Sequence, residues 1–204
     1  MASNFFAMIS RLKYIDRWAL MRNTHDENLS EHCMETACIA HALAVIGNRR
    51  FGKYYNAERA ALLGLYHDAP ETLTGDMPTP VKYYSPHIRE AYAQVEQSAC
   101  EHLVSMLPED LRADFAPFFF KDETDEDLWK LVKSADKICA YIKCIEEKKA
   151  GNTEFDRAAE STLESINALD IPEAEEFMKE FLDGYRLTRS EEHTSELQSR
   201  FDLV

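Results

Sequence analysis

Glycine is scarce in this sequence, with six residues in 204, and runs of β-branched residues are absent. A C-x-x-C pair is also missing, and the five cysteines fall at spacings that match neither zinc knuckles nor redox pairs. No window approaches the roughly 20 apolar residues of a membrane span, and no cleavable signal is evident at the N-terminus. We therefore expect a cytoplasmic protein whose cysteines act as small helix-core residues in a reducing compartment.

Positive charge is scarce as well. The chain has 23 Lys and Arg against 37 Asp and Glu, a formal net charge of −14 at pH 7. Such a balance repels phosphate backbones and anionic lipid surfaces. We expect neither a nucleic-acid polymer nor a membrane as partner, and a small-molecule substrate fits better.

Apolar residues recur at three- and four-residue steps along most of the chain, which is the helical period. This pattern predicts an all-α helical bundle that forms a single domain over residues 1–188. Asn28 followed by Glu31 resembles a capping box, Gly47 marks a helix end, and Pro78 belongs to a predicted loop. The predicted helices cover about 4–16, 28–47, 56–68, 85–107, a short stretch after residue 108, 124–151, 154–169 and 172–187.

The C-terminal segment is set apart from the rest. Its stretch RSEEHTSELQS resembles the translation of a common sequencing-adapter oligonucleotide. We expect residues 189–204 to be an artefactual, disordered tail, and assign no function to its His193.

Two histidines and two aspartates fall at apolar or helical positions where an unpaired charge is costly. They are His32, His67, Asp68 and Asp136. Taken singly, each is more often a core histidine or a structural ion pair than a ligand. Together, two imidazoles and two carboxylates suit a divalent cation of borderline hardness, such as manganese, cobalt, iron or zinc.

The order H…HD…D resembles the HD superfamily of metal-dependent phosphohydrolases, whose fold is an all-α bundle. The stretches SRLKYIDRWALMRN, ENLSEH, NAERAALLGLYHDAPETLTGDMPTPVKYY and LVKSADKICAYIKCIEE are similar to the bacterial YfbR-like 5′-deoxynucleotidases over roughly residues 4–187. The resemblance implies hydrolysis of deoxyribonucleoside 5′-monophosphates to a deoxynucleoside and phosphate. It also implies one divalent ion, Co²⁺, Mn²⁺ or a similar transition metal, with ligands His32, His67, Asp68 and Asp136.

The resemblance assigns roles to further residues. Glu71 follows His67 by four residues and Asp68 by three, so a helix continuing past Pro70 would place its carboxylate on their side. The resemblance makes Glu71 and Arg17 catalytic, Glu71 as a general acid or base and Arg17 as the group that orients the phosphate. It places the nucleotide against Arg17, Trp18, His32, Asp68, Asp76, Met77, Pro78 and Thr79.

Other readings stay open. Arg17 could cap the first helix, Trp18 could fill the core, and Glu71 could be a surface acid. A dinuclear HD phosphodiesterase or oxygenase would need extra histidines before the last aspartate, where His87 and His102 occur at positions typical of structural histidines. A non-catalytic, nucleotide-sensing HD module would bind its ligand without releasing phosphate.

The resemblance also implies a homodimer. Among the apolar residues near the C-terminus, Phe177 and Phe181 are candidates for its interface. Both could equally complete the core.

Overall fold

The computed structural model describes residues 2–82, 84–187 and 191, and within them the chain forms helices and no β-strand. The predicted all-α fold is confirmed. Apart from Glu191, the suspected artefactual tail lies outside the described residues. The elements are α1 (Phe5–Ile9), η1 (Ser10–Tyr14), α2 (Leu29–Arg50), α3 (Ala57–Tyr66), α4 (Glu71–Thr74), α5 (Thr79–Lys82), α6 (Pro86–Ser105), α7 (Glu109–Phe115), η2 (Ala116–Phe118), η3 (Glu123–Asp125), α8 (Glu126–Lys149), α9 (Asp156–Asn167) and α10 (Pro172–Arg186), where η marks a 3₁₀ helix.

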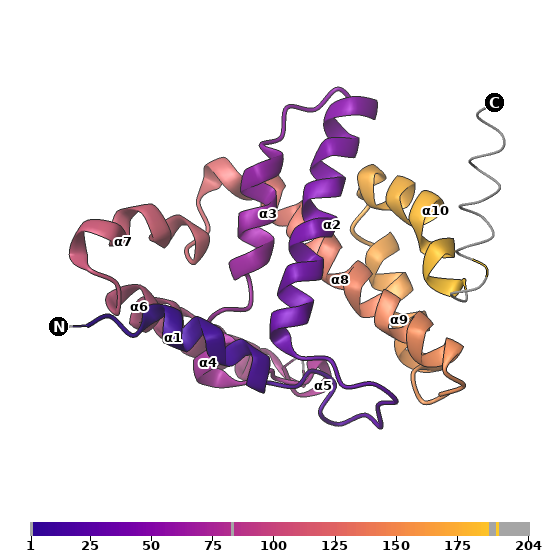
Figure 1. Ribbon diagram of the computed structural model, residues 1–204, viewed down its shortest axis with the longest axis horizontal. Coiled ribbons are helices and arrows are strands. Elements are labelled where there is room, and N and C mark those ends of the chain that lie inside the picture. The colour runs from indigo at the N-terminus through magenta and orange to yellow at the C-terminus, as the bar shows by residue number, and fades with distance from the viewer. Residues whose placement is uncertain (1, 83, 188–190, 192–204) are drawn as a thin grey trace.

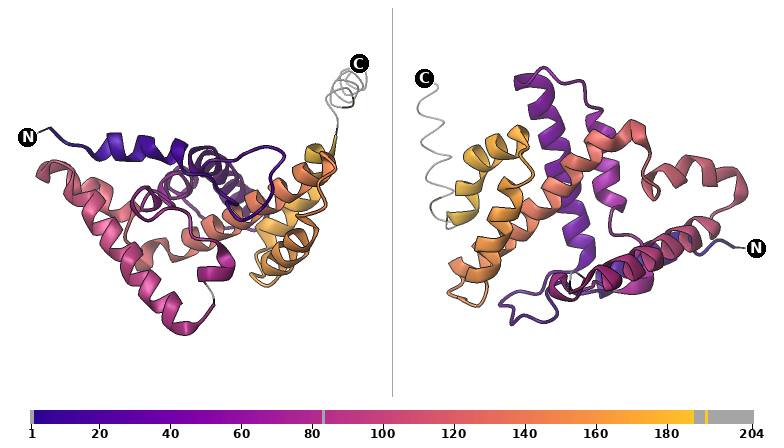
Figure 2. Two further views of the ribbon diagram at one scale, coloured as in Figure 1. Left: turned by 90° about the horizontal axis from the view of Figure 1, so that it is seen from below. Right: turned by 180° about the vertical axis from the view of Figure 1, so that it is seen from behind.

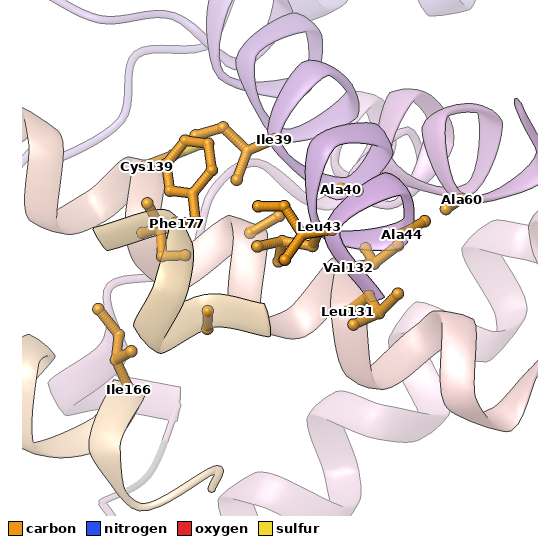
Figure 3. Close-up of a cluster of buried hydrophobic side chains, with 14 of the residues drawn as sticks. Ile39, Ala40, Leu43, Ala44, Ala60, Leu131, Val132, Cys139, Ile166 and Phe177 are labelled. Atoms are coloured by element: carbon orange, nitrogen blue, oxygen red, sulfur yellow. The ribbon is translucent and has the colours of Figure 1, made fainter. Parts of the chain in front are cut away.

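Helices α2, α3 and α8 form the centre of the molecule (Figure 1). Helices α9 and α10 lie along one flank of α8, and α1, α4, α6 and α7 lie toward the other side (Figure 2). The main hydrophobic cluster fills the space between α2, α8 and α10, where Leu43, Val132 and Phe177 converge (Figure 3). Burial of each such side chain contributes about 1.5–3 kcal/mol relative to exposure.

The structure shows which of the two C-terminal phenylalanines, Phe177 or Phe181, belongs to the core. Phe177 is buried in the core, while Phe181 on the same helix is 47% exposed. All five cysteines were expected in the helix core. This prediction is wrong for Cys38, which is exposed on α2. The other four are buried, and the described helices include none that is long and apolar enough to cross a membrane.

The helix ends mostly follow from local sequence features, but the structure corrects two predicted helices. The Asn28–Glu31 capping box is present. Helix α2 continues past Gly47 to Arg50, and the lack of a side chain at Gly47 permits close packing with Tyr55, which a Cβ atom would meet at 2.6 Å. The first predicted helix changes to 3₁₀ geometry at Ser10, which is common near helix ends.

Helices α2 and α3 approach each other closely at Gly64. A Cβ atom on Gly64 would lie 2.9 Å from the Ala37 Cα and 3.1 Å from the Thr36 carbonyl oxygen, both backbone atoms of α2. The absence of a side chain therefore permits the contact. It brings the end of α3, and the residues that follow it, against the first turns of α2.

Replacement of Gly64 by alanine is expected to destabilise the protein by about 1–3 kcal/mol, because backbone atoms cannot move aside as a flexible side chain would. The matched control is Gly184→Ala on α10, where a Cβ would meet nothing within 4 Å. That change should be neutral or stabilising by up to about 1 kcal/mol. Urea unfolding of both variants checks this, and equal stability of the two would contradict the close approach.

Candidate metal and substrate site

The site is built where the start of α2 meets the end of α3. His32 lies in the first turns of α2 and is fully buried. His67 and Asp68 lie in a tight turn directly after α3, which ends at Tyr66. The His67 Nδ1 atom donates to the Gly64 carbonyl oxygen at 2.7 Å, which leaves Nε2 free to face His32.

These three residues form the one group in the described part of the chain whose ligand atoms all lie within 4.8 Å of one another. The Asp68 Oδ2 atom is 3.0 Å from His67 Nε2 and 3.5 Å from His32 Nε2. Yet both Nε2 atoms are buried without a hydrogen-bond partner among the described residues. Close but misaligned donor and acceptor atoms are typical of ligands around one cation, since bonds of about 2.1 Å leave neighbouring ligand atoms about 3 Å apart.

Asp136 reaches the same place from α8 but stands at its edge. Its Oδ1 atom is 3.2 Å from His32 Nε2 and 3.9 Å from Arg17 Nη2. It is not a member of the group within 4.8 Å, and its side chain is 39% exposed. Among the described residues, the ion-pair contacts of Asp136 are with His32 and Arg17.

Arg17 and Trp18 lie in the connection between η1 and α2. The ends of this connection are tied together, because Arg17 N donates to the Glu27 carbonyl oxygen at 2.8 Å and Leu29 N donates to that of Ile15 at 2.9 Å. Arg17 does not cap the first helix, since its guanidinium donates to the Glu27 carboxylate at 2.8 Å. Trp18 is only half-buried and packs edge-on against Phe155, with 5.3 Å between ring centroids.

The condition under which helical spacing would place Glu71 beside His67 and Asp68, a helix that continues past Pro70, is not met. Helix α3 does not continue past Pro70, which instead precedes the four-residue helix α4 that Glu71 begins. The carboxyl group is nevertheless buried, 9% of the residue is exposed, and Oε2 has no hydrogen-bond partner among the described residues. Glu71 is therefore not a surface acid.

Burial raises the pKa of Glu71 to about 9, with the charges of Asp68 and Asp76 adding to the effect. The pKa of Asp76 is also raised, chiefly by burial, with Asp68 and Asp136 adding to the effect and Arg17 and His32 opposing it. Met77 and Pro78 are half-buried in the loop that follows, and Thr79 is exposed at the start of α5. The predicted loop thus ends at Pro78 and α5 begins at Thr79, because Pro80 is tolerated in the first turn of a helix.

The electrostatics of the site suit a bound cation next to a fixed positive charge. Burial and the nearby Arg17 charge lower the pKa of His32, which favours its neutral, ligating form. Burial alone would lower the pKa of Arg17, but Glu27, Asp136 and Asp68 raise it above its ordinary value. Burial would raise the pKa of Asp136, but His32, His67 and Arg17 hold it below its usual range.

Sequence reasoning missed one residue of the site, Glu27. Its carboxylate accepts from Arg17 and from the Trp18 indole N–H, and its Oε1 is 3.7 Å from His32 Nδ1. No spacing pattern marks it, because it lies in a connection and contacts residues nine and ten positions earlier. His87 and His102, in contrast, are exposed on α6 and belong to no metal-binding group of the described residues.

Sequence comparisons identify the family to which the chain is similar. Residues 4–185 match the model of a family described as 5′-deoxynucleotidase YfbR-like. A 5′-deoxynucleotidase of Vibrio vulnificus is 47% identical over 189 residues, which cover 93% of this chain and 97% of that protein. The 5′-deoxynucleotidase YfbR of Escherichia coli is 49% identical over 189 residues, with coverage of 93% and 95%.

Solved structures share the fold. An HD-domain phosphohydrolase of Listeria innocua superimposes with a TM-score of 0.77 at 23% identity, covering 97% of this chain and 98% of that one. The HD phosphohydrolase DatZ of cyanophage S-2L, bound to dA and one catalytic Zn²⁺ ion, gives a TM-score of 0.64 at 20% identity, with coverage of 89% and 96%.

Proposed function

The chain belongs to the YfbR-like 5′-deoxynucleotidase family of HD phosphohydrolases, and we propose that it hydrolyses deoxyribonucleoside 5′-monophosphates to deoxynucleoside and phosphate in a metal-dependent reaction. The single observation that carries the metal dependence is the convergence of two unpartnered, buried imidazole nitrogens on Asp68. Because the bond cleaved is that of a phosphate monoester, the proposed reaction is that of a phosphoric monoester hydrolase.

The donor set fits one divalent transition metal. His32, His67 and Asp68 would hold the ion, with Asp136 completing the ligands from α8. Two imidazoles with carboxylates match Co²⁺, Mn²⁺ or Zn²⁺ better than calcium. When bound, such an ion polarises a phosphoryl oxygen and lowers the pKa of a water.

Arg17 supplies the charge that meets the phosphate. Its guanidinium is held by Glu27 on one side and lies 3.9 Å from Asp136 on the other, beside the ligand group. A guanidinium there neutralises the phosphoryl oxygens through paired N–H donors. This local positive charge explains how an acidic protein can hold a dianionic substrate.

Glu71 is the group available to move a proton. A buried carboxyl with a pKa of about 9 carries a proton at neutral pH and can donate it to the leaving 5′-oxygen. The departing deoxynucleoside then leaves as a neutral alcohol. The oxygen of the attacking water bonds to phosphorus as the bond to the 5′-oxygen breaks, and one proton of that water restores the Glu71 carboxyl group.

The nucleoside would lie between Trp18 and the turn of Asp76, Met77, Pro78 and Thr79. Gly75, with φ of +72°, lets the chain turn sharply out of α4 and into the segment that begins at Asp76. In this proposal His32 and Asp68 also border the bound substrate. A close fit of the turn to the sugar would exclude a 2′-hydroxyl and produce the preference for deoxyribose.

The proposal includes the assembly and location expected for the family. Phe181 is the exposed C-terminal aromatic that a homodimer interface would cover. Five free cysteines suit the reducing cytoplasm.

The test is phosphate release from matched deoxy- and ribonucleoside monophosphates, with chelated protein reloaded with Mn²⁺, Co²⁺ or Zn²⁺. We expect release from the deoxynucleotides, dependence on the added ion, and one ion per chain by elemental analysis. Two ions per chain would favour the dinuclear alternative. Tight nucleotide binding without phosphate release would favour the sensing module.

A further inference from the structure

The backbone of Trp18 is unusual. Its φ is +59°, in the left-handed region that residues with bulky side chains rarely adopt. Such a conformation persists only where surrounding contacts hold it. Trp18 O accepts a hydrogen bond from Met21 N at 2.8 Å, which fixes the turn but not the direction of the indole.

The direction of the indole is fixed by Glu27. Its Oε2 atom accepts from Trp18 Nε1 at 3.0 Å, while Oε1 accepts from Arg17 Nη1 at 2.8 Å. The side chains of Arg17 and Glu27 are each 12% exposed, so this ion pair is less screened by water than a surface pair. One carboxylate therefore sets the guanidinium and the indole relative to each other.

A buried ion pair on α8 supports the loop that carries Glu27. Glu147 is 1% exposed, and its Oε2 accepts from Thr24 N at 2.9 Å and from Thr24 Oγ1 at 2.7 Å. Lys143 donates to Glu147 at 2.5 Å and also to the His25 carbonyl oxygen. The backbone just before Glu27 is thus attached to the rigid end of α8.

The same corner of the fold supports the Trp18 ring. Phe155, 1% exposed, packs edge-on against Trp18, and the Lys143 Nζ atom lies 5.8 Å from the centre of the Phe155 ring. Neither Lys143 nor Phe155 is a ligand of the metal group. These contacts are made to Trp18 and to the loop that carries Glu27, and none of them is made to a residue of the metal group.

We propose that Glu27 is a positioning residue that holds Arg17 and Trp18 as one unit, so that the phosphate clamp and the nucleoside-facing ring keep a fixed spacing. The inference rests on the substrate roles of Arg17 and Trp18 given under the proposed function. Glu27 itself does not touch the substrate. It acts through the two side chains that do, and the buried Glu147–Lys143 pair keeps its loop in place.

The experiment is a double-mutant cycle on phosphate release from dAMP with saturating Mn²⁺. Glu27→Gln leaves one carbonyl acceptor for two donors, so we expect kcat/KM to fall by about tenfold or more, as for a lost charge-assisted hydrogen bond. Trp18→Phe removes the indole N–H but keeps a flat ring. In that background Glu27→Gln should cost at least about threefold less than in the wild type, because one of its two partners is already gone.

Asp26→Asn is the matched control, since this neighbouring carboxylate is exposed and makes no hydrogen bond or ion pair with the described residues. It should behave as the wild type. Strictly multiplicative effects in the cycle, or activity of Glu27→Gln within twofold of wild type, would overturn the proposal. Should Glu27→Gln fail to fold, Glu27→Asp, which keeps the charge on a shorter side chain, replaces it in the cycle.

A second readout does not depend on turnover. In a Trp129→Phe background Trp18 is the sole tryptophan, and Glu27→Gln should move its emission to longer wavelength as the indole loses its partner and meets more water. An unchanged emission spectrum would contradict the positioning role of Glu27. A wild-type protein that released no phosphate from any deoxynucleotide would instead refute the proposed function, with the emission result still deciding this inference.

Discussion

Replacement of Asp68 by asparagine is expected to lower phosphate release by about a thousandfold or more, because it removes the charge on which both histidines converge. Asp68 Oδ2 is 3.0 Å from His67 Nε2 and 3.5 Å from His32 Nε2. The amide has nearly the same volume, so packing is preserved while the anionic ligand is lost. A neutral group in that place binds a divalent cation far more weakly.

Two measurements check this expectation together. Metal content after reloading with Mn²⁺ or Zn²⁺ should fall from one ion per chain toward none, and turnover should fall with it. Asp110→Asn is the control, because Asp110 is exposed on α7 and the same charge is removed there. A variant of Asp68 that kept both its ion and its turnover would show that the ligand group had been wrongly identified.

Much of this site follows from helical periodicity and capping. The position of His32 in a predicted helix with an apolar face indicated burial, and the capping box at Asn28 fixed where that helix begins. The position of Asp136 on α8, one helical turn from core residues, predicted that it faces inward. Regular helices carry such information because each side chain's direction follows from its number.

The rest depends on tertiary contacts that no local pattern contains. Glu27 belongs to an irregular connection, where direction does not follow from position. Lys143 and Glu147 have the i, i+4 spacing of an ordinary surface pair, and only the loop that folds over them makes them buried. Helix α3 ends before Pro70, near the predicted boundary, but the tight turn that follows it and brings Glu71 inward has no signature in the sequence.

Replacement of Glu71 by glutamine should have opposite effects on turnover and on stability. Loss of a general acid is expected to lower kcat by about 10²- to 10⁴-fold. Metal content should stay at the wild-type level, since Glu71 is not in the ligand group. Turnover equal to that of the wild type would exclude Glu71 as the proton donor.

In metal-free protein, Glu71→Gln should raise the free energy of unfolding at pH 8 although it lowers turnover. Burial raises the pKa of Glu71 to about 9 in the folded state, against an ordinary value of 4.5. Between these pH values the folded state binds a proton that the unfolded state has released, so the free energy of unfolding falls as pH rises through this window. The loss reaches the order of a few kcal/mol at pH 8.

Glutamine cannot ionise, so Glu71→Gln should remove this loss and make the metal-free protein more stable than the wild type at pH 8 and little different near pH 5. Urea unfolding at both pH values measures it, with Glu160→Gln on the exposed face of α9 as the control for charge. A variant that lost turnover and also lost stability at pH 8 would point to a packing role for Glu71. A gain in stability together with the loss of turnover would mean that the fold tolerates a buried carboxyl because the reaction needs its proton.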